Sequence, residues 1–277
     1  MAEDGDEGTR GAAWLVAAVL VSAWLVVQWT TWQPGMPGAS FDDLSWPATL
    51  AQAAFEGRPF GGGLIYTGGP WSLLYTGQHH PALAWLPTWY SGAVALAMAT
   101  ALLCLWQDRS APALLLLGLA ATLPLSPFSD YRLLALPLLA LLLWLRGGRG
   151  ATLLCVALLV LAAFAAWAKF SVFIAALLIL LPAEFLLLLR ERLWPLLTPA
   201  FLLACVGAHL LAGQPLSALP DFLRQSFALA AGYGDAISRN GPHSWSPLWS
   251  SLERCGFLLL ALATLLPERS PALPDVP

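Results

Sequence analysis

The sequence predicts an all-α membrane protein, a polytopic transmembrane helical bundle of about eight spans. Hydrophobic residues make up 58% of the 277 residues and charged residues only 10%, whereas roughly 25% of the residues in a typical soluble domain are charged. The apolar residues also gather in runs of about 20, the length that a helix needs to cross the hydrocarbon core of a bilayer. A formal net charge of −3 offers no basic surface for nucleic acid, so the lipid bilayer is the expected partner.

The predicted spans follow one another along most of the chain. Five apolar runs are long, at 12–31, 82–106, 151–168, 170–189 and 194–211. Three more are shorter or carry charges, at 112–127, 132–145 and 247–266. Short helices are accommodated by local thinning of the bilayer or inside a bundle. The transmembrane domain therefore covers 12–266, between an acidic cytoplasmic tail at 1–11 and a Pro-rich tail at 267–277 that we expect to be disordered.

Basic residues in the short turns predict that the N-terminus is cytoplasmic, because short cytoplasmic loops carry an excess of Lys and Arg. With the N-terminus inside, the short outer turns contain only Arg132 and Lys169. The longer loops 32–81 and 212–246 then lie outside. High usage of Arg over Lys, with many Ala, Leu and Trp residues, suggests a bacterial cytoplasmic (inner) membrane. The arginines in the short inner turns are Arg109, Arg146, Arg149, Arg190 and Arg192.

Both outer loops are expected to carry short helices that lie along the membrane surface. In the first loop the helix runs from about Leu44 to Glu56. In the second loop the stretch 221–227 is a candidate, with Phe222 and Phe227 on its apolar side.

Asp42 and Asp43 are the main candidates for chemistry, because an acidic pair stands out in so charge-poor a chain. Two adjacent carboxylates near the membrane surface can hold a divalent cation, Mg²⁺ or Mn²⁺, through oxygen ligands. One of them can act instead as a general base that takes the proton of an acceptor hydroxyl. Alternatively, the pair only caps the helix that begins near Leu44, since carboxylates stabilise helix N-termini.

This order of parts resembles the membrane glycosyltransferases of the GT-C type, which take sugars from polyprenyl-phosphate carriers. In those enzymes one or two acidic residues of the first outer loop lie close behind the first span. The resemblance therefore implies that Asp42 or Asp43 is the catalytic or cation-binding carboxylate. It also implies that the sugar passes to an envelope glycan, lipid or protein on the outer face of the membrane.

The same loop is similar to that of a group of larger bacterial membrane proteins. In that group an acidic position, a Gly-x-Pro-aromatic step and an aromatic-Thr-x-Gly-Pro stretch recur in this order. Here the last two are Gly57 to Phe60 and Tyr66 to Pro70. GT-C enzymes usually have more spans or a soluble C-terminal domain, so an inactive relative or fragment stays open as an alternative.

Basic side chains outside the membrane are candidates for binding the carrier phosphate. Lys169 is the only lysine and lies at a tight turn between two spans. A cation there can contact a lipid phosphate or simply extend to the interface. Adjacent histidines near the end of the first loop either join the donor site or are interfacial residues without a ligand. The candidates are Lys169, Arg58, Arg132, Arg224, His79 and His80.

A non-enzymatic membrane protein, either a transporter component or a structural subunit, is the alternative from a different class. Transporters place polar side chains and broken helices near the bilayer midplane. Glu184 is the one acid well inside a predicted span, and His209 lies near the outer end of another. Their clustering with Gln28 around one cavity would indicate transport. A structural role for Glu184, close to the cytoplasmic end of its span, is the other interpretation.

Overall fold

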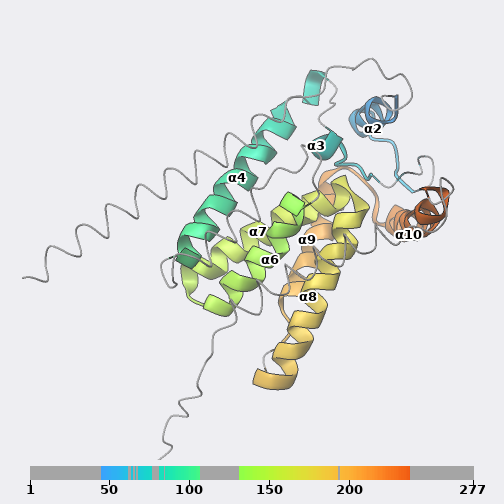
Figure 1. Ribbon diagram of the computed structural model, residues 1–277. Helices are drawn as coiled ribbons and strands as arrows, with labels where there is room; N and C mark the ends of the chain where they lie inside the picture. The colour runs from blue at the N-terminus through green and yellow to red at the C-terminus, as the bar shows by residue number, and fades with distance from the viewer. Residues whose placement is uncertain are drawn as a thin grey trace, which may run out of the picture.

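The computed structural model describes residues 45–61, 64, 66, 68–76, 81–83, 85–106, 131–192 and 194–237. This part of the chain is helical, apart from turns and one isolated β-bridge between Phe60 and Leu64. Short 3-10 turns, η1 (Pro81–Leu83) and η2 (Leu216–Ala218), precede two of the helices. The α-helices, arranged as in Figure 1, are α2 (Ser45–Phe55), α3 (Leu73–Thr76), α4 (Trp85–Trp106), α6 (Tyr131–Arg146), α7 (Arg149–Ala168), α8 (Phe170–Glu191), α9 (Leu197–Leu211) and α10 (Leu219–Ile237).

Three of the described helices, α4, α7 and α8, are long and apolar enough to cross a membrane. A fourth candidate is the pair Leu197–Leu211 and Leu216–Gly232, which is bent by 117°. The all-helical class predicted from the sequence is therefore confirmed for the described residues, and these helices are compatible with a membrane protein. α6 is apolar but has only 16 residues, fewer than the roughly 20 that a span needs.

The total of about eight spans stays a prediction. The apolar runs 12–31, 112–127 and 247–266 lie outside the described residues, as do the tails at 1–11 and 267–277. Helices occupy the other five predicted runs, with bounds that differ by a few residues. The helix predicted from about Leu44 to Glu56 is present as α2, and its position along the membrane surface stays a prediction.

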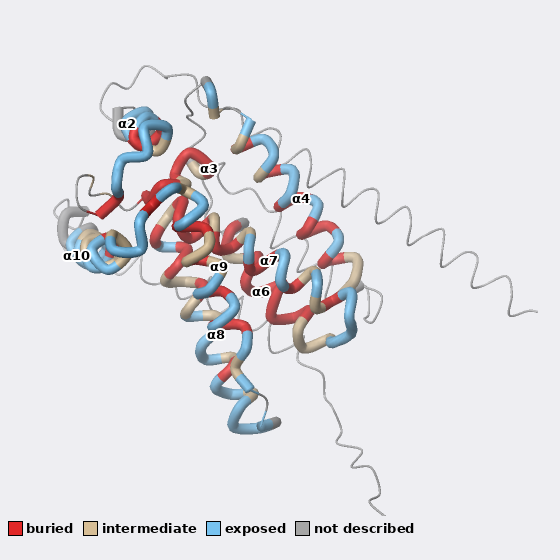
Figure 2. Tube along the Cα trace, turned by 180° about the vertical axis from the view of Figure 1, so that it is seen from behind, coloured by how far each residue is buried: buried red, intermediate tan, exposed pale blue. Residues whose placement is uncertain are grey.

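α7 is the central helix of the described bundle. It packs against α4, α6, α8 and α9, and Figure 2 shows it as one of the most buried elements. Its second half is rich in alanine, and Ala162, Ala163, Ala165 and Ala166 are completely buried. Small side chains let neighbouring helix backbones approach closely, which favours association of helices in lipid. The close packing of the bundle therefore depends on this small-residue stretch.

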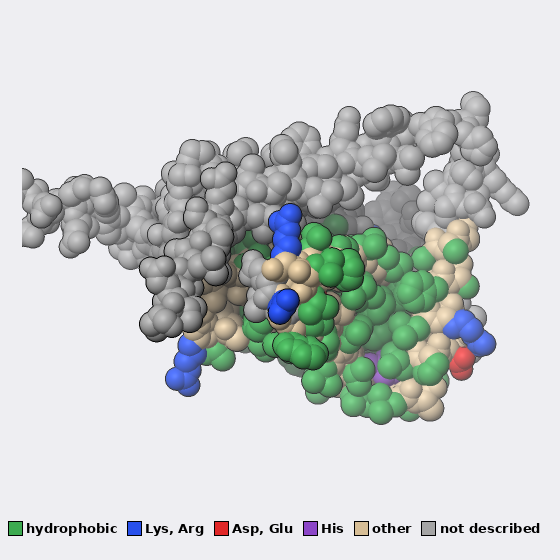
Figure 3. Space-filling model, turned by 90° about the horizontal axis from the view of Figure 1, so that it is seen from below, with side chains coloured by type: hydrophobic (Ala, Val, Ile, Leu, Met, Phe, Trp, Pro, Cys, Tyr) green, Lys and Arg blue, Asp and Glu red, His purple; other side chains and the backbone are tan. Residues whose placement is uncertain are grey.

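α8 is the least covered of the three long candidate spans. Only 28% of its apolar window is buried inside the protein, against 50% for α4 and 56% for α7. Leu178, Phe185 and Leu189 are among its exposed side chains. Figure 3, seen from below, shows a described surface that is mostly hydrophobic, with charged groups at a few points. An exposed apolar helix of this length suits contact with lipid.

α7 and α8 meet at Lys169, a single extended residue between two helices. Its N–H donates to the carbonyl of Ala165, and its carbonyl accepts from the N–H of Val172, both at 2.9 Å. The predicted tight turn is therefore confirmed. We call this part of the molecule the Lys169 end and include in it the described residues of 56–76 and residues 208–227. The opposite end contains the α6–α7 and α8–α9 connections.

α10 leaves α9 through the sharp bend and crosses the Lys169 end (Figure 1). Phe222 is buried, with its ring centroid 4.9 Å from that of Trp167. The ring of Phe227 meets Phe170 edge-on at 4.8 Å. The predicted helix at 221–227 is thus present, and it extends to Ile237 because the following Ala- and Leu-rich stretch also favours helix.

Gly61 marks the closest approach between the first loop and α10. It adopts a φ of 101°, and a Cβ built on it would lie 2.5 Å from the backbone nitrogen of Phe222. Both observations call for glycine here, since other residues rarely adopt this φ and no side chain fits against a backbone atom. The first loop and α10 therefore pack backbone against backbone.

Replacing Gly61 by Ala should destabilise the protein, because it combines an unfavourable φ with an overlap that only backbone movement can relieve. We expect a loss of roughly 2 kcal/mol or more. The measurement is the thermal unfolding temperature of the detergent-solubilised protein. Gly207→Ala is the matched control, because a Cβ on Gly207 meets nothing within 4 Å. Equal unfolding temperatures for the two variants would contradict the close approach.

Candidate functional site

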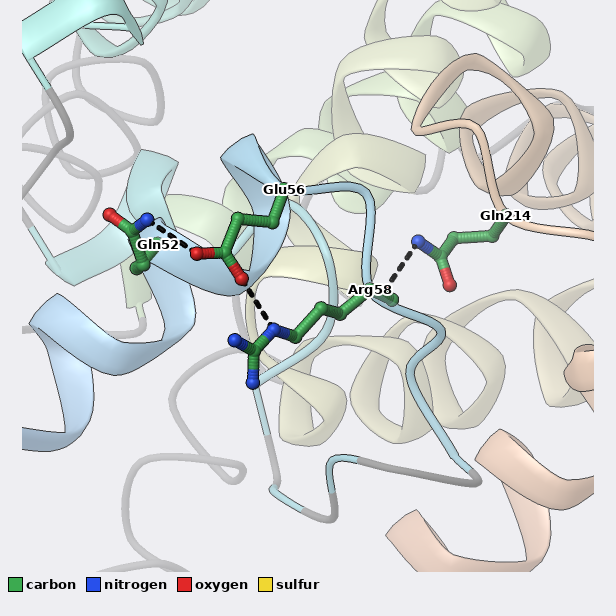
Figure 4. Close-up of polar contacts among 4 residues, drawn as sticks. All are labelled: Gln52, Glu56, Arg58 and Gln214. Atoms are coloured by element: carbon green, nitrogen blue, oxygen red, sulfur yellow. Dashed lines mark hydrogen bonds and ion pairs between the residues drawn. The ribbon is translucent and has the colours of Figure 1, made fainter.

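A buried glutamine joins the first loop to the connection between α9 and α10. Gln214 Nε2 donates to the carbonyl of Arg58 at 3.1 Å, and Gln214 Oε1 accepts from the N–H of Phe60 at 2.9 Å. Gln214 is 2% exposed, so each polar end of its amide needs a partner inside the protein. The amide thereby fixes the backbone of the Gly-x-Pro-aromatic step at Gly57 to Phe60 (Figure 4).

Two tryptophans tie the Lys169 end to α9. Trp71, which directly follows the aromatic-Thr-x-Gly-Pro stretch, donates through Nε1 to the carbonyl of Ala208 at 2.8 Å. Trp167 in α7 donates through Nε1 to the carbonyl of Cys205. Gly69 lies so close to α7 that an added Cβ would be 2.5 Å from the Trp167 carbonyl oxygen. Gly69 of the second motif therefore lies directly on the end of α7.

Lys169 contacts the first loop through Tyr75 in α3. Its Nζ donates to the Tyr75 hydroxyl at 2.8 Å and lies 4.4 Å from the centroid of the Tyr75 ring. The side chain is half-buried. Lys169, which the sequence marked as a candidate for binding phosphate, thus lies beside an aromatic residue of the first loop.

Arg58 lies beside Glu56, just after α2 ends. Arg58 Nε donates to Glu56 Oε2 at 2.5 Å, and Gln52 Nε2 donates to Glu56 Oε1 at 2.6 Å. These hydrogen bonds, first that of Gln52 and then that of Arg58, lower the pKa of Glu56 below its usual value. Glu56 is therefore ionised at neutral pH and pairs with the Arg58 guanidinium.

Arg224 also pairs with a carboxylate, but on the surface of α10. Its Nη2 donates to Asp221 Oδ1 at 2.9 Å, one turn earlier on the exposed face of α10. Exposed ion pairs of this spacing contribute little to stability. The contacts described for Arg58, Lys169 and Arg224 involve three different partners, although all three residues belong to the Lys169 end.

The remaining candidates cannot be placed. Asp42, Asp43, His79 and His80 lie outside the described residues, and the side chain of Arg132 does as well. Within the described part of the chain no three His, Cys, Asp or Glu side chains come together as metal ligands. A role for the acidic pair in binding Mg²⁺ or Mn²⁺ therefore stays a prediction.

Glu184 and His209 lie near opposite ends of α9. The Glu184 carboxylate accepts hydrogen bonds from the backbone N–H groups of Leu197 and Thr198, at the start of the helix. His209 is completely buried near the other end, with Nε2 3.2 Å from the Pro215 carbonyl oxygen. Twelve residues of helix separate Leu197 from His209, which corresponds to about 18 Å. These two polar residues do not form one cluster, and Glu184 has the structural role that its position favoured.

Three residues of the site were not singled out from the sequence, namely Gln214, Glu56 and Tyr75. Gln214 contacts residues more than 150 positions away, and no local pattern encodes such a pairing. The sequence gives one weak indication of Gln214: amide side chains are scarce in this apolar chain, and this one lies between Gly213 and Pro215.

Replacing Glu184 by Leu should destabilise the protein by roughly 2–4 kcal/mol, because two buried N–H groups lose a charged acceptor. Glu184→Gln should cost less, since its amide oxygen can still accept one of the two hydrogen bonds. Thermal unfolding in detergent would measure both effects. A Leu variant as stable as the wild type would refute the capping role.

No family model, no curated protein and no solved structure matches this chain.

Proposed function

We propose that the protein is a GT-C-like glycosyltransferase of the bacterial cytoplasmic membrane. It transfers a sugar from a polyprenyl-phosphate donor to an envelope glycan, lipid or protein acceptor on the outer face. One observation carries the proposal: the polar contacts between different elements of the described chain gather mainly at the Lys169 end, where the first loop folds onto apolar helices. A donor with its isoprenoid chain in the bilayer presents its phosphate and sugar at such a surface.

The distribution of arginines supports an outer position for this end. The short connections at the opposite end carry Arg146, Arg149, Arg190 and Arg192. Short loops rich in Arg face the cytoplasm. With the opposite end inside, the Lys169 end faces outward and the N-terminus is cytoplasmic.

In the proposed reaction the acceptor hydroxyl oxygen attacks the anomeric carbon of the donor sugar, and the bond from that carbon to the phosphate oxygen breaks. Asp42 or Asp43 takes the hydroxyl proton as general base, or ligates a divalent cation that binds the phosphate. Polyprenyl phosphate leaves with the bonding electrons, and Arg58 and Lys169 stabilise its negative charge. The acidic pair and Arg58 flank α2, which begins at Ser45.

The alternative, a non-enzymatic transporter component or structural subunit, has less support. Ion-coupled transport needs polar groups that converge within the membrane. Glu184 is instead engaged in capping α9, and His209 lies at the other end of that helix. Gln28, the third member of the expected cluster, lies outside the described residues.

The double variant Asp42→Asn/Asp43→Asn should lose sugar transfer by about 100-fold or more, because it removes the base while keeping size and polarity. The measurement is release of polyprenyl phosphate, detected by mass spectrometry, from a panel of polyprenyl-phosphate hexoses and pentoses with an envelope extract as acceptor source. Membrane insertion and unfolding temperature should not change. Full turnover by the double variant would refute the assignment of the acids, and a wild type inactive on every donor would refute the proposed reaction.

A further inference from the structure

Arg58 is held at its backbone by a residue from a distant part of the chain. Gln214 accepts from the N–H of Phe60 and donates to the carbonyl of Arg58, so the amide spans the residues on both sides of Pro59. Since Gln214 is buried, these hydrogen bonds are shielded from water. The backbone that carries the Arg58 side chain is therefore fixed relative to the α9–α10 connection.

The Arg58 side chain is held separately by α2. Glu56, directly after α2, receives one hydrogen bond from Arg58 Nε and one from Nε2 of Gln52, which lies four residues earlier in α2. Gln52 thereby orients the carboxylate, and the carboxylate orients the guanidinium. The low pKa of Glu56 keeps this acceptor charged over the whole neutral range.

This arrangement leaves the terminal fork of the guanidinium accessible. Glu56 occupies only Nε, and Figure 4 shows the two terminal nitrogens of Arg58 extending away from it. The Arg58 side chain is 65% exposed. Two parallel N–H groups of an arginine match two oxygens of a phosphate, which gives a charge-assisted, bidentate contact.

Arg224 shows what an ordinary surface ion pair looks like in the same protein. It uses one of its terminal nitrogens, Nη2, to reach Asp221, so its fork is already engaged. Its partner lies on the same exposed helix face. Arg58 differs from Arg224 in two ways. Glu56 does not use the terminal nitrogens of Arg58, and the buried Gln214 amide anchors the Arg58 backbone.

We propose that Arg58 binds a lipid-linked phosphate group through its two terminal nitrogens, with Glu56 and Gln214 as positioning residues. This inference rests on the proposed function, because the expected ligand is the isoprenoid phosphate of the sugar donor. The headgroup phosphate of an ordinary phospholipid has the same chemistry and is the other source. An arginine that is already positioned loses less conformational freedom when it binds a ligand. Glu56 and Gln214 therefore raise the affinity of Arg58 for phosphate without contacting the phosphate themselves.

Replacing Glu56 distinguishes a positioning role from a purely electrostatic one, because the two roles change the affinity for an anion in opposite directions. If Glu56 acts only as a negative charge beside Arg58, Glu56→Ala should strengthen the binding of an anion. If it orients the guanidinium, Glu56→Ala should weaken binding by about threefold or more. Glu56→Gln should lie between the wild type and Glu56→Ala, because its amide oxygen can still accept from Arg58 Nε.

The test is a native mass spectrometry titration of the full-length protein in a maltoside detergent, which contains no phosphate. The probes are farnesyl phosphate, dihexanoyl phosphatidylglycerol and inorganic phosphate. Arg58→Gln and Arg58→Lys should each raise the Kd for farnesyl phosphate by about 10-fold, because lysine keeps the charge but lacks the fork. Arg190→Gln is the control for loss of one exposed positive charge at the opposite end and should not change the Kd. Unfolding temperatures of all variants should equal that of the wild type.

Farnesyl phosphate bound more tightly than the other probes, with the expected order among the Arg58 and Glu56 variants, supports the inference with the isoprenoid carrier as ligand. The same order with phosphatidylglycerol as the tightest probe supports the phosphate site and assigns it to a phospholipid headgroup. Binding unaffected by Arg58→Gln, or strengthened by Glu56→Ala, overturns the inference. In that case sugar transfer by the wild type leaves the proposed function intact. Conversely, if binding depends on Arg58 but no donor is turned over, the phosphate site is supported and the proposed reaction is refuted.

Discussion

Where the described part of the first loop is buried, its non-helical backbone must find hydrogen-bond partners within the protein, and the arrangement of the Lys169 end follows from this constraint. Phe60 and Gln214 are buried where the loop meets the α9–α10 connection, and an unpaired buried N–H or carbonyl is costly. Gln214, from the connection between α9 and α10, satisfies the backbone of Arg58 and Phe60. The sharp bend between α9 and α10 presents Gln214 to the loop, and Phe222 then packs on Trp167.

The sequence was sufficient to predict the class of fold because the signal is compositional and local. Apolar runs of span length predicted α4, α7 and α8, and their bounds agree closely with the helices. The turn at Lys169 could be predicted because the apolar run on each side of it is itself about the length of a span. The role of Glu184 was one of two interpretations, and the hydrogen bonds to Leu197 and Thr198 decide between them.

The packing of the first loop could not be predicted, for a physical reason. Its contacts are long-range: Gln214 lies more than 150 residues from its partners, and Lys169 lies 94 residues from Tyr75. Such pairings leave no periodic trace in the sequence. Nor does the sequence show that the backbones of Gly61 and Gly69 contact α10 and α7 directly. The acidic pair at 42–43, the main sequence candidate, lies outside the described residues.

The proposed donor and the contacts of Arg58 and Lys169 both imply that the Lys169 end binds an isoprenoid phosphate. The most direct measurement is native mass spectrometry of wild-type protein extracted gently from its own membrane, to identify the lipids that remain bound. The account predicts retention of a polyprenyl phosphate or its sugar adduct, and the adduct mass would identify the sugar class. Retention of ordinary phospholipids only, even after the carrier is added in excess, would contradict it.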